Sequence, residues 1–204
     1  MMKWLIAVTL ALGLGYNYWK GHRTVRLEPP PVVHIAQAAE TREPLQKNLM
    51  AGPVFRMNDY TLTALAEFSI GARVVLAEHY STDREADLSP VDLVLAWGPM
   101  NDTRVLDALS ISQGGRFYRW RHEGEPPIPR REIELNSANM HMIPGSDSIA
   151  RRLKSISSGD RVRIRGYLVQ AVAKDGWRWT SSMTREDTGA GACELIFVQD
   201  LEVL

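Results

Sequence analysis

The stretch RVRIRGYLVQAVAKDGWRWT, residues 161–180, decides how the chain can fold, because its apolar and polar side chains alternate with a period of two. That period is typical of a β-strand that buries one face. Gly166 lies inside the alternating part, where a glycine indicates a bend or the close approach of another backbone. Lys174-Asp175-Gly176 predicts a hairpin turn, because Asp-Gly suits turns with positive φ. We therefore expect a strongly curved sheet whose buried face holds Val162, Ile164 and Leu168.

Further strand patterns lie on both sides of this stretch. Residues 68–76 and 116–121 alternate in the same way, and residues 193–204 begin with a run that is apolar on both faces, as in a central strand. Residues 92–97 fit either a strand or a short helix, because a serine and a proline precede them like a helix start.

Two helices are predicted. A cap at Asn101 or Asp102 predicts a short helix that ends near Leu109, and amphipathic spacing predicts a second helix over about 147–157. The expected fold is therefore mainly β with one or two helices (α+β). A small barrel or a strongly bent antiparallel sheet fits best, and the OB-fold is the nearest named architecture.

Composition sets limits on the function. The chain has 204 residues, 45% of them hydrophobic, which is enough apolar material for one domain with a core. Its 24 basic and 24 acidic side chains give a net charge of zero, which argues against general nucleic-acid binding. The single cysteine, Cys193, excludes an intrachain disulfide framework and a multi-cysteine zinc site.

The first twenty residues, MMKWLIAVTLALGLGYNYWK, predict a membrane-targeting segment. An uncharged run from Trp4 to Trp19 follows Lys3 and ends in aromatic residues, which suit a membrane interface. A helix of this length, at about 1.5 Å per residue, is shorter than a typical bilayer core, so a cleavable signal competes with an anchor. The nearest small-x-small cleavage pattern is Ala36-Gln37-Ala38, far downstream, and we expect an uncleaved anchor over residues 1–20.

The orientation of that anchor has two interpretations. Lys20, Arg23 and Arg26 outnumber Lys3, which by the positive-inside rule would keep the C-terminal side in the cytoplasm. An N-terminal apolar segment with a basic start is, however, the usual export signal. We expect a single-pass protein of the bacterial inner membrane with its domain in the periplasm.

The rest of the chain divides at about residue 58. Residues 21–58 contain the run Pro29-Pro30-Pro31 and no sustained period, so we expect a stiff Pro-rich linker there. A single globular domain is expected over residues 59–204.

Asp187-Thr188-Gly189-Ala190 spells the start of an aspartic protease loop. In those proteases two such loops share a proton between their carboxylates, and each follows a buried strand. Here the polar Thr184-Arg185-Glu186 precedes a single copy. We interpret the stretch as a glycine-rich turn.

Scattered histidines and carboxylates give an alternative function. His79 and His141, with Asp83 and Asp92, could supply nitrogen and oxygen ligands for a metal-assisted hydrolase. The stretch that contains Asp83 does not match a calcium loop, because Leu88 stands where an EF-hand needs glycine. Cys193 with His141 could form a nucleophile and base, but a cysteine that opens an apolar strand is usually inert. We expect no catalytic residue, metal or cofactor unless the hydrolase alternative holds.

The polar face of the opening stretch is the predicted binding surface. Alternating arginines beside an aromatic ring can bind phosphates or carboxylates and stack on a ring. A solvated strand face is the alternative. The residues expected to bind are Arg161, Arg163, Arg165, Tyr167 and Arg178.

Three segments resemble a family of uncharacterised bacterial exported or membrane-anchored proteins. They are DREADLSPVDLVLAWGPMND (83–102), SANMHMIP (137–144) and KDGWRWTSSMTREDTGAGACELIFV (174–198). The resemblance covers residues 60–204; it implies a bacterial source and a discrete domain but transfers no activity. We therefore expect a membrane-anchored, non-catalytic module of the bacterial envelope that binds a protein partner or an anionic ligand.

Overall fold

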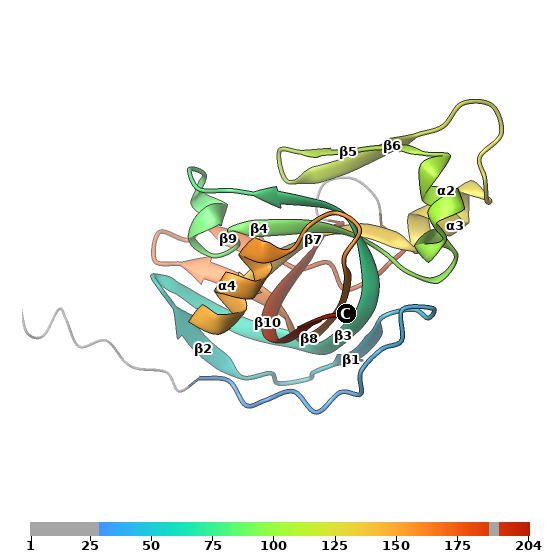
Figure 1. Cartoon of the computed structure of the whole chain (residues 1–204). Helices are drawn as coiled ribbons and strands as arrows, with labels where there is room; N and C mark the ends of the chain where they lie inside the picture. The colour runs from blue at the N-terminus through green and yellow to red at the C-terminus, as the bar shows by residue number, and fades with distance from the viewer. Residues whose placement is uncertain (1–28, 188–191) are drawn as a thin grey trace, which may run out of the picture.

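The structure is a computed structural model that describes residues 29–187 and 192–204. Its centre is a closed barrel of five strands (Figure 1). Strand β3 pairs with both β4 and β8, β4 pairs with β7, and β10 lies between β7 and β8. All these pairs are antiparallel except β7–β10. The barrel strands are β3 (Tyr60–His79), β4 (Val91–Ala96), β7 (Ser137–Pro144), β8 (Arg161–Ala173) and β10 (Glu194–Val203).

This connectivity is that of an OB-fold, a small Greek-key barrel. Helix α4 (Asp147–Ser155) lies between the third and fourth barrel strands, and Ile149 and Leu153 share one apolar cluster with the barrel interior. The expected mainly β fold with a small barrel is confirmed. Gly166 accounts for the expected curvature of the sheet, because it lets β10 approach β8 closely. A Cβ at this position would lie 1.9 Å from the carbonyl oxygen of Phe197 on β10.

The remaining elements are short. Two 3₁₀ turns follow β3 and β4, and β9 extends β8 as a hairpin. A separate two-stranded sheet, β5–β6, lies outside the barrel (Figure 1). These elements are η1 (Arg84–Asp87), η2 (Gly98–Asn101), α2 (Thr103–Asp107), β5 (Ser110–Gly114), β6 (Phe117–Arg121), α3 (Arg130–Leu135) and β9 (Arg178–Thr180).

Most of the predicted elements occur. The alternating face of β8 is buried as expected, with Val162, Ile164 and Leu168 fully inaccessible. Each such side chain stabilises the fold by about 1.5–3 kcal/mol. Gly176 has φ +90° in the β8–β9 hairpin turn, as Asp-Gly predicts. Residues 92–97, which fitted two structures, form strand β4 up to Ala96, and all six strand residues are buried.

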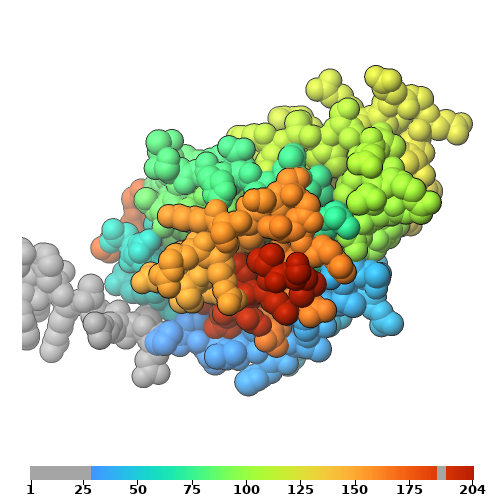
Figure 2. All heavy atoms as spheres, viewed as in Figure 1, coloured from blue at the N-terminus to red at the C-terminus, as the bar shows by residue number. Residues whose placement is uncertain are grey.

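The described part of the expected linker over residues 21–58 belongs to the folded body. Strands β1 (Leu45–Asn48) and β2 (Val54–Met57) both pair with β3. Upstream of β1 the chain lies against the barrel, with Val33 and Ala38 buried. Figure 2 shows this N-terminal segment (blue) beside the C-terminal strand (red). Short strands among prolines carry no period, which is why the sequence pattern suggested a spacer.

The described residues contain three α-helices, of which α3 was not predicted. Within the described parts of the chain, no helix has both the length and the apolarity needed to cross a bilayer. The expected anchor over residues 1–20 lies outside the described residues.

Gly166 gives a direct test of barrel closure. We expect Gly166→Ala to destabilise the protein by about 1–3 kcal/mol or more, because the new methyl group must displace the backbone of β10. Gly114→Ala is the matched control, since nothing lies within 4 Å of a Cβ placed there. Chemical denaturation measures both. Equal stability of the two variants would contradict the close approach of β8 and β10.

Candidate functional site

A buried polar cluster lies on the outer face of β4 and β7. Asp92 on β4 and His141 on β7 are direct partners in the strand register. Their side chains point away from the barrel interior, which contains the neighbouring Leu93. Asp92 is fully buried and His141 is 3% exposed, and His141 Nδ1 lies 2.9 Å from Asp92 Oδ2. A carboxylate this deeply buried needs compensating charge.

Arg116 supplies that charge from the turn between β5 and β6. Its guanidinium donates to Asp92 Oδ1 at 2.8 Å and to both carboxylate oxygens of Asp83, at 2.6 and 3.1 Å. The same group stacks on the ring of Tyr80, 3.7 Å from the ring centroid. Burial by itself lowers the pKa of Arg116, but Asp83 and Asp92 outweigh burial and raise it. We call Arg116, Asp83, Asp92 and His141 the Arg116 cluster.

Amide groups add a second connection between the hairpin and the barrel. Gln113 Nε2 donates to Asn139 Oδ1 at 2.7 Å, and Asn139 Nδ2 donates to the carbonyl oxygen of Arg116 at 2.9 Å. From the other side, the ring of Trp179 packs on His141 with centroids 4.7 Å apart. The Arg116 cluster thus joins three loops: the segment after β3, the β5–β6 hairpin and the segment around β9.

The structure brings together three of the four residues of the predicted metal site. Asp83, Asp92 and His141 converge, but around the guanidinium of Arg116. His79 is exposed at the end of β3, and its side chain makes no hydrogen bond or ion pair within the described residues. Over residues 29–187 and 192–204, no group of three histidine, cysteine or acidic side chains is arranged to hold a metal ion.

The arginines of the predicted binding surface on β8 form ion pairs with acidic side chains. Arg161 pairs with Glu40, Arg163 with Glu202 and Arg165 with Asp200. The Tyr167 ring is not available for stacking, because it is 3% exposed and its hydroxyl donates to the carbonyl oxygen of Pro31 at 3.2 Å. Arg178 lies apart from this group, exposed on β9.

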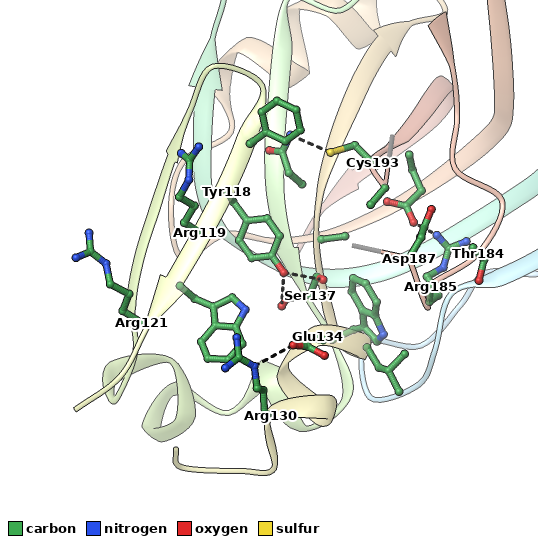
Figure 3. Close-up of a pocket in the computed structure, with 18 residues that line it drawn as sticks. Tyr118, Arg119, Arg121, Arg130, Glu134, Ser137, Thr184, Arg185, Asp187 and Cys193 are labelled. Atoms are coloured by element: carbon green, nitrogen blue, oxygen red, sulfur yellow. Dashed lines mark hydrogen bonds and ion pairs between the residues drawn. The ribbon is translucent and has the colours of Figure 1, made fainter. Parts of the chain in front are cut away.

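A groove of about 590 Å³ lies between β6 and the start of β7 (Figure 3). Tyr118 points into it and shares a hydrogen bond of 3.1 Å with the Ser137 hydroxyl. Arg130 lies over the ring of Trp120 and donates to Glu134 at 3.1 Å. We call this cavity the hairpin groove. Its lining includes Trp97, Tyr118, Trp120, Arg130, Glu134, Ser137, Asn139, Arg185, Asp187 and Cys193.

Buried polar side chains line the wall of the groove opposite β6. Arg185 forms an ion pair with the buried Glu194, and burial lowers the pKa of Arg185 to about 10. Burial also raises the pKa of Cys193 to about 11, so its thiol is protonated at neutral pH and is a poor nucleophile. Asp187 accepts a hydrogen bond from Ser182 at 2.7 Å. The rest of the predicted Asp-Thr-Gly turn, Thr188–Ala190, lies outside the described residues.

The sequence analysis named Asp83, Asp92 and His141 of the Arg116 cluster and missed Arg116 itself. A signal was present: Gly114 and Gly115 precede an alternating strand, which favours a tight hairpin. Comparison with models of protein families, with curated proteins and with solved structures gives no match. The resemblance to bacterial envelope proteins therefore stays a prediction.

We expect Arg116→Gln to cost about 3–5 kcal/mol of unfolding free energy, because it leaves the carboxylate of Asp92 buried without its partner. Arg121→Gln is the matched control, since Arg121 is exposed and makes no ion pair within the described residues. Urea unfolding measures both. Adding Asp92→Asn to Arg116→Gln should recover part of the loss; no recovery would contradict the role of buried charge.

Asp83 gives the cluster a predictable pH dependence. The hydrogen bonds from Arg116 lower the pKa of Asp83 below its ordinary value of 3.8. The ionised carboxylate therefore stabilises the fold above about pH 4, and this contribution is lost as pH falls through the lower folded pKa. The difference in unfolding free energy between wild type and Asp83→Asn should be largest near neutral pH. A difference that stays constant down to about pH 2 would contradict an ionic role.

Proposed function

We infer that the protein is a membrane-anchored, non-catalytic binding module of the bacterial envelope, and that its ligand binds in the hairpin groove. One observation carries this inference. The groove is lined by Ser137, Ala138 and Asn139 of β7, the third strand of the barrel, and by Trp97, which directly follows β4, the second strand. OB-folds bind their ligands on the face of the second and third strands.

The Arg116 cluster supports a binding role for the hairpin. Two carboxylates from separate segments meet one guanidinium at the hairpin turn, which fixes the hairpin over the barrel face. A wall held in this way is pre-organised, so less conformational entropy is lost when a ligand binds. Aromatic rings and arginines are also the side chains that contribute most at binding surfaces.

The expected anchor would keep this module close to the bilayer. The described chain lies against the barrel from about residue 33, so the segment between a membrane segment over residues 1–20 and the folded body is short. At roughly 3.3–3.6 Å per residue, about a dozen residues reach at most some 45 Å. Ligands within that distance of the membrane surface would be accessible to the groove.

The hydrolase alternative has less support. Its residues Asp83, Asp92 and His141 do meet, but Arg116 already compensates both carboxylates. A metal ion would have to displace a guanidinium that makes three hydrogen bonds to these two side chains. The proposed function therefore assigns the cluster a structural role.

Site-specific crosslinking in intact cells tests the proposal. A photoreactive phenylalanine analogue replaces Phe117, which lines the groove and is 38% exposed, in the full-length chain. The control position is Val203, which is 46% exposed at the opposite end of β10 from Glu194. We expect a discrete crosslinked product from position 117 and none of the same mass from position 203. Identical products from both positions, or none from position 117, would overturn the proposal.

A further inference from the structure

In the part of the chain that the structure describes, no strand pairs with the edge of β6 that faces the hairpin groove. The lining of the groove includes all five residues of β6 and, among the described residues, none of β5. Side chains of neighbouring residues on a strand point to opposite faces, so a cavity that touches five in a row lies along the strand edge.

The turn geometry determines which backbone groups point to that edge. Gly115 and Arg116 both have positive φ, 59° and 71°, as in the two-residue turn of a tight hairpin. The closing pair Gly114–Phe117 is then hydrogen-bonded, and hydrogen-bonded pairs alternate along an antiparallel ladder. The N–H and C=O groups of Tyr118 and Trp120 therefore point away from β5, toward the free edge. None of these groups has a hydrogen-bond partner among the described residues.

The two faces of β6 differ in chemistry. Tyr118 points toward the barrel side, whereas Arg119 and Arg121 extend from the opposite face (Figure 3). Trp120 shares the face of Tyr118, because side chains two residues apart on a strand lie on the same side. Serines are the partners of both arginines on β5, and neither arginine makes an ion pair within the described residues. The inner face thus carries two aromatic rings, and the outer face carries two arginines beside the exposed ring of Phe117.

We propose that the hairpin groove binds an extended peptide segment of a partner protein, which adds to β6 as a third strand and alternates acidic with apolar residues. This inference rests on the proposed function and names its ligand. The main chain of the segment would pair with Tyr118 and Trp120, the mode known as β-augmentation. Its acidic side chains would lie beside Arg119 and Arg121, and its apolar ones would pack on the aromatic face, as cross-strand neighbours do.

A peptide fits these features better than a nucleic acid. Bases could stack on Trp120, but phosphates cannot pair with a row of alternating N–H donors and C=O acceptors. Unprotected edges of this kind are otherwise avoided, because they pair with other chains. Charged side chains on β6 limit such pairing to segments of complementary charge.

Titration calorimetry of the detergent-solubilised full chain tests the inference. The probe is an end-blocked peptide of about four Glu-Val repeats, long enough to span β6 at roughly 3.3 Å per residue. A Lys-Val peptide of equal length and an oligothymidylate are the comparison ligands. We expect saturable binding of the Glu-Val peptide only. Binding of the oligothymidylate instead, or no binding of the Glu-Val peptide up to about 1 mM, would overturn the inference.

Backbone methylation of the probe separates strand pairing from charge attraction. In an extended peptide the N–H groups of alternate residues point to opposite edges. Methylating the nitrogens of all glutamates, or instead of all valines, should therefore abolish binding for one peptide and spare it for the other. Methylating both sets of nitrogens should abolish binding whichever way the peptide runs along β6, and binding that survives this change would rule out edge pairing.

Charge reversal on the protein identifies the surface. The double variant Arg119→Glu, Arg121→Glu should bind the Glu-Val peptide about tenfold or more weakly at low salt, and it should bind the Lys-Val peptide. Arg151→Glu with Lys154→Glu, on the exposed face of α4, is the matched control and should leave binding unchanged. An equal loss of Glu-Val binding in both double variants would contradict a site on β6. A crosslinked partner from position 117 without Glu-Val binding would reject the strand pairing and keep the proposed function.

Discussion

The pairing of Arg116 with Asp83 and Asp92 is the interaction on which the arrangement around the groove depends. Asp92 is fully buried on the outer face of β4, where an unpaired carboxylate would be strongly unfavourable. Its compensation comes from a residue at the tip of a hairpin that is not part of the barrel. The need to neutralise a buried charge therefore helps to hold the hairpin, beside the packing of Ile111 and Trp120 on a small apolar cluster. The groove between β6 and β7 exists because the hairpin is held there.

The barrel and the hairpin have separate physical origins. The barrel closes because alternating strands bury one apolar face and because Gly166 lets β10 approach β8. Such a barrel needs neither Arg116 nor Asp92, since both lie outside its interior. Polar residues on the outer face of β4 and β7 are costly for stability, which points to a role beyond folding. In this protein they position a wall of the groove.

Periodicity predicted the long elements and failed for short or fully buried ones. β3, β6, β8 and α4 alternate or repeat clearly and were predicted. The six residues of β4 are all buried, so no polar face marks them as a strand. β1 and β2 have only four residues each and lie among prolines. They form strands because each pairs with an edge of β3. The Arg116 cluster joins residues distant in the sequence, so local patterns identified its carboxylates but could not identify their shared partner.

Two runs of alternating arginines show why a charge pattern alone does not identify a binding surface. Arg163 and Arg165 on β8 lie beside β10, whose register places Glu202 and Asp200 opposite them, and both arginines are paired. Arg119 and Arg121 on β6 have the same spacing, but serines lie opposite them on β5. Strand pairing decides which run is compensated within the fold, and only the arginines of β6 also border an open strand edge. The proposed binding surface therefore follows from the neighbours that strand pairing gives each run of arginines.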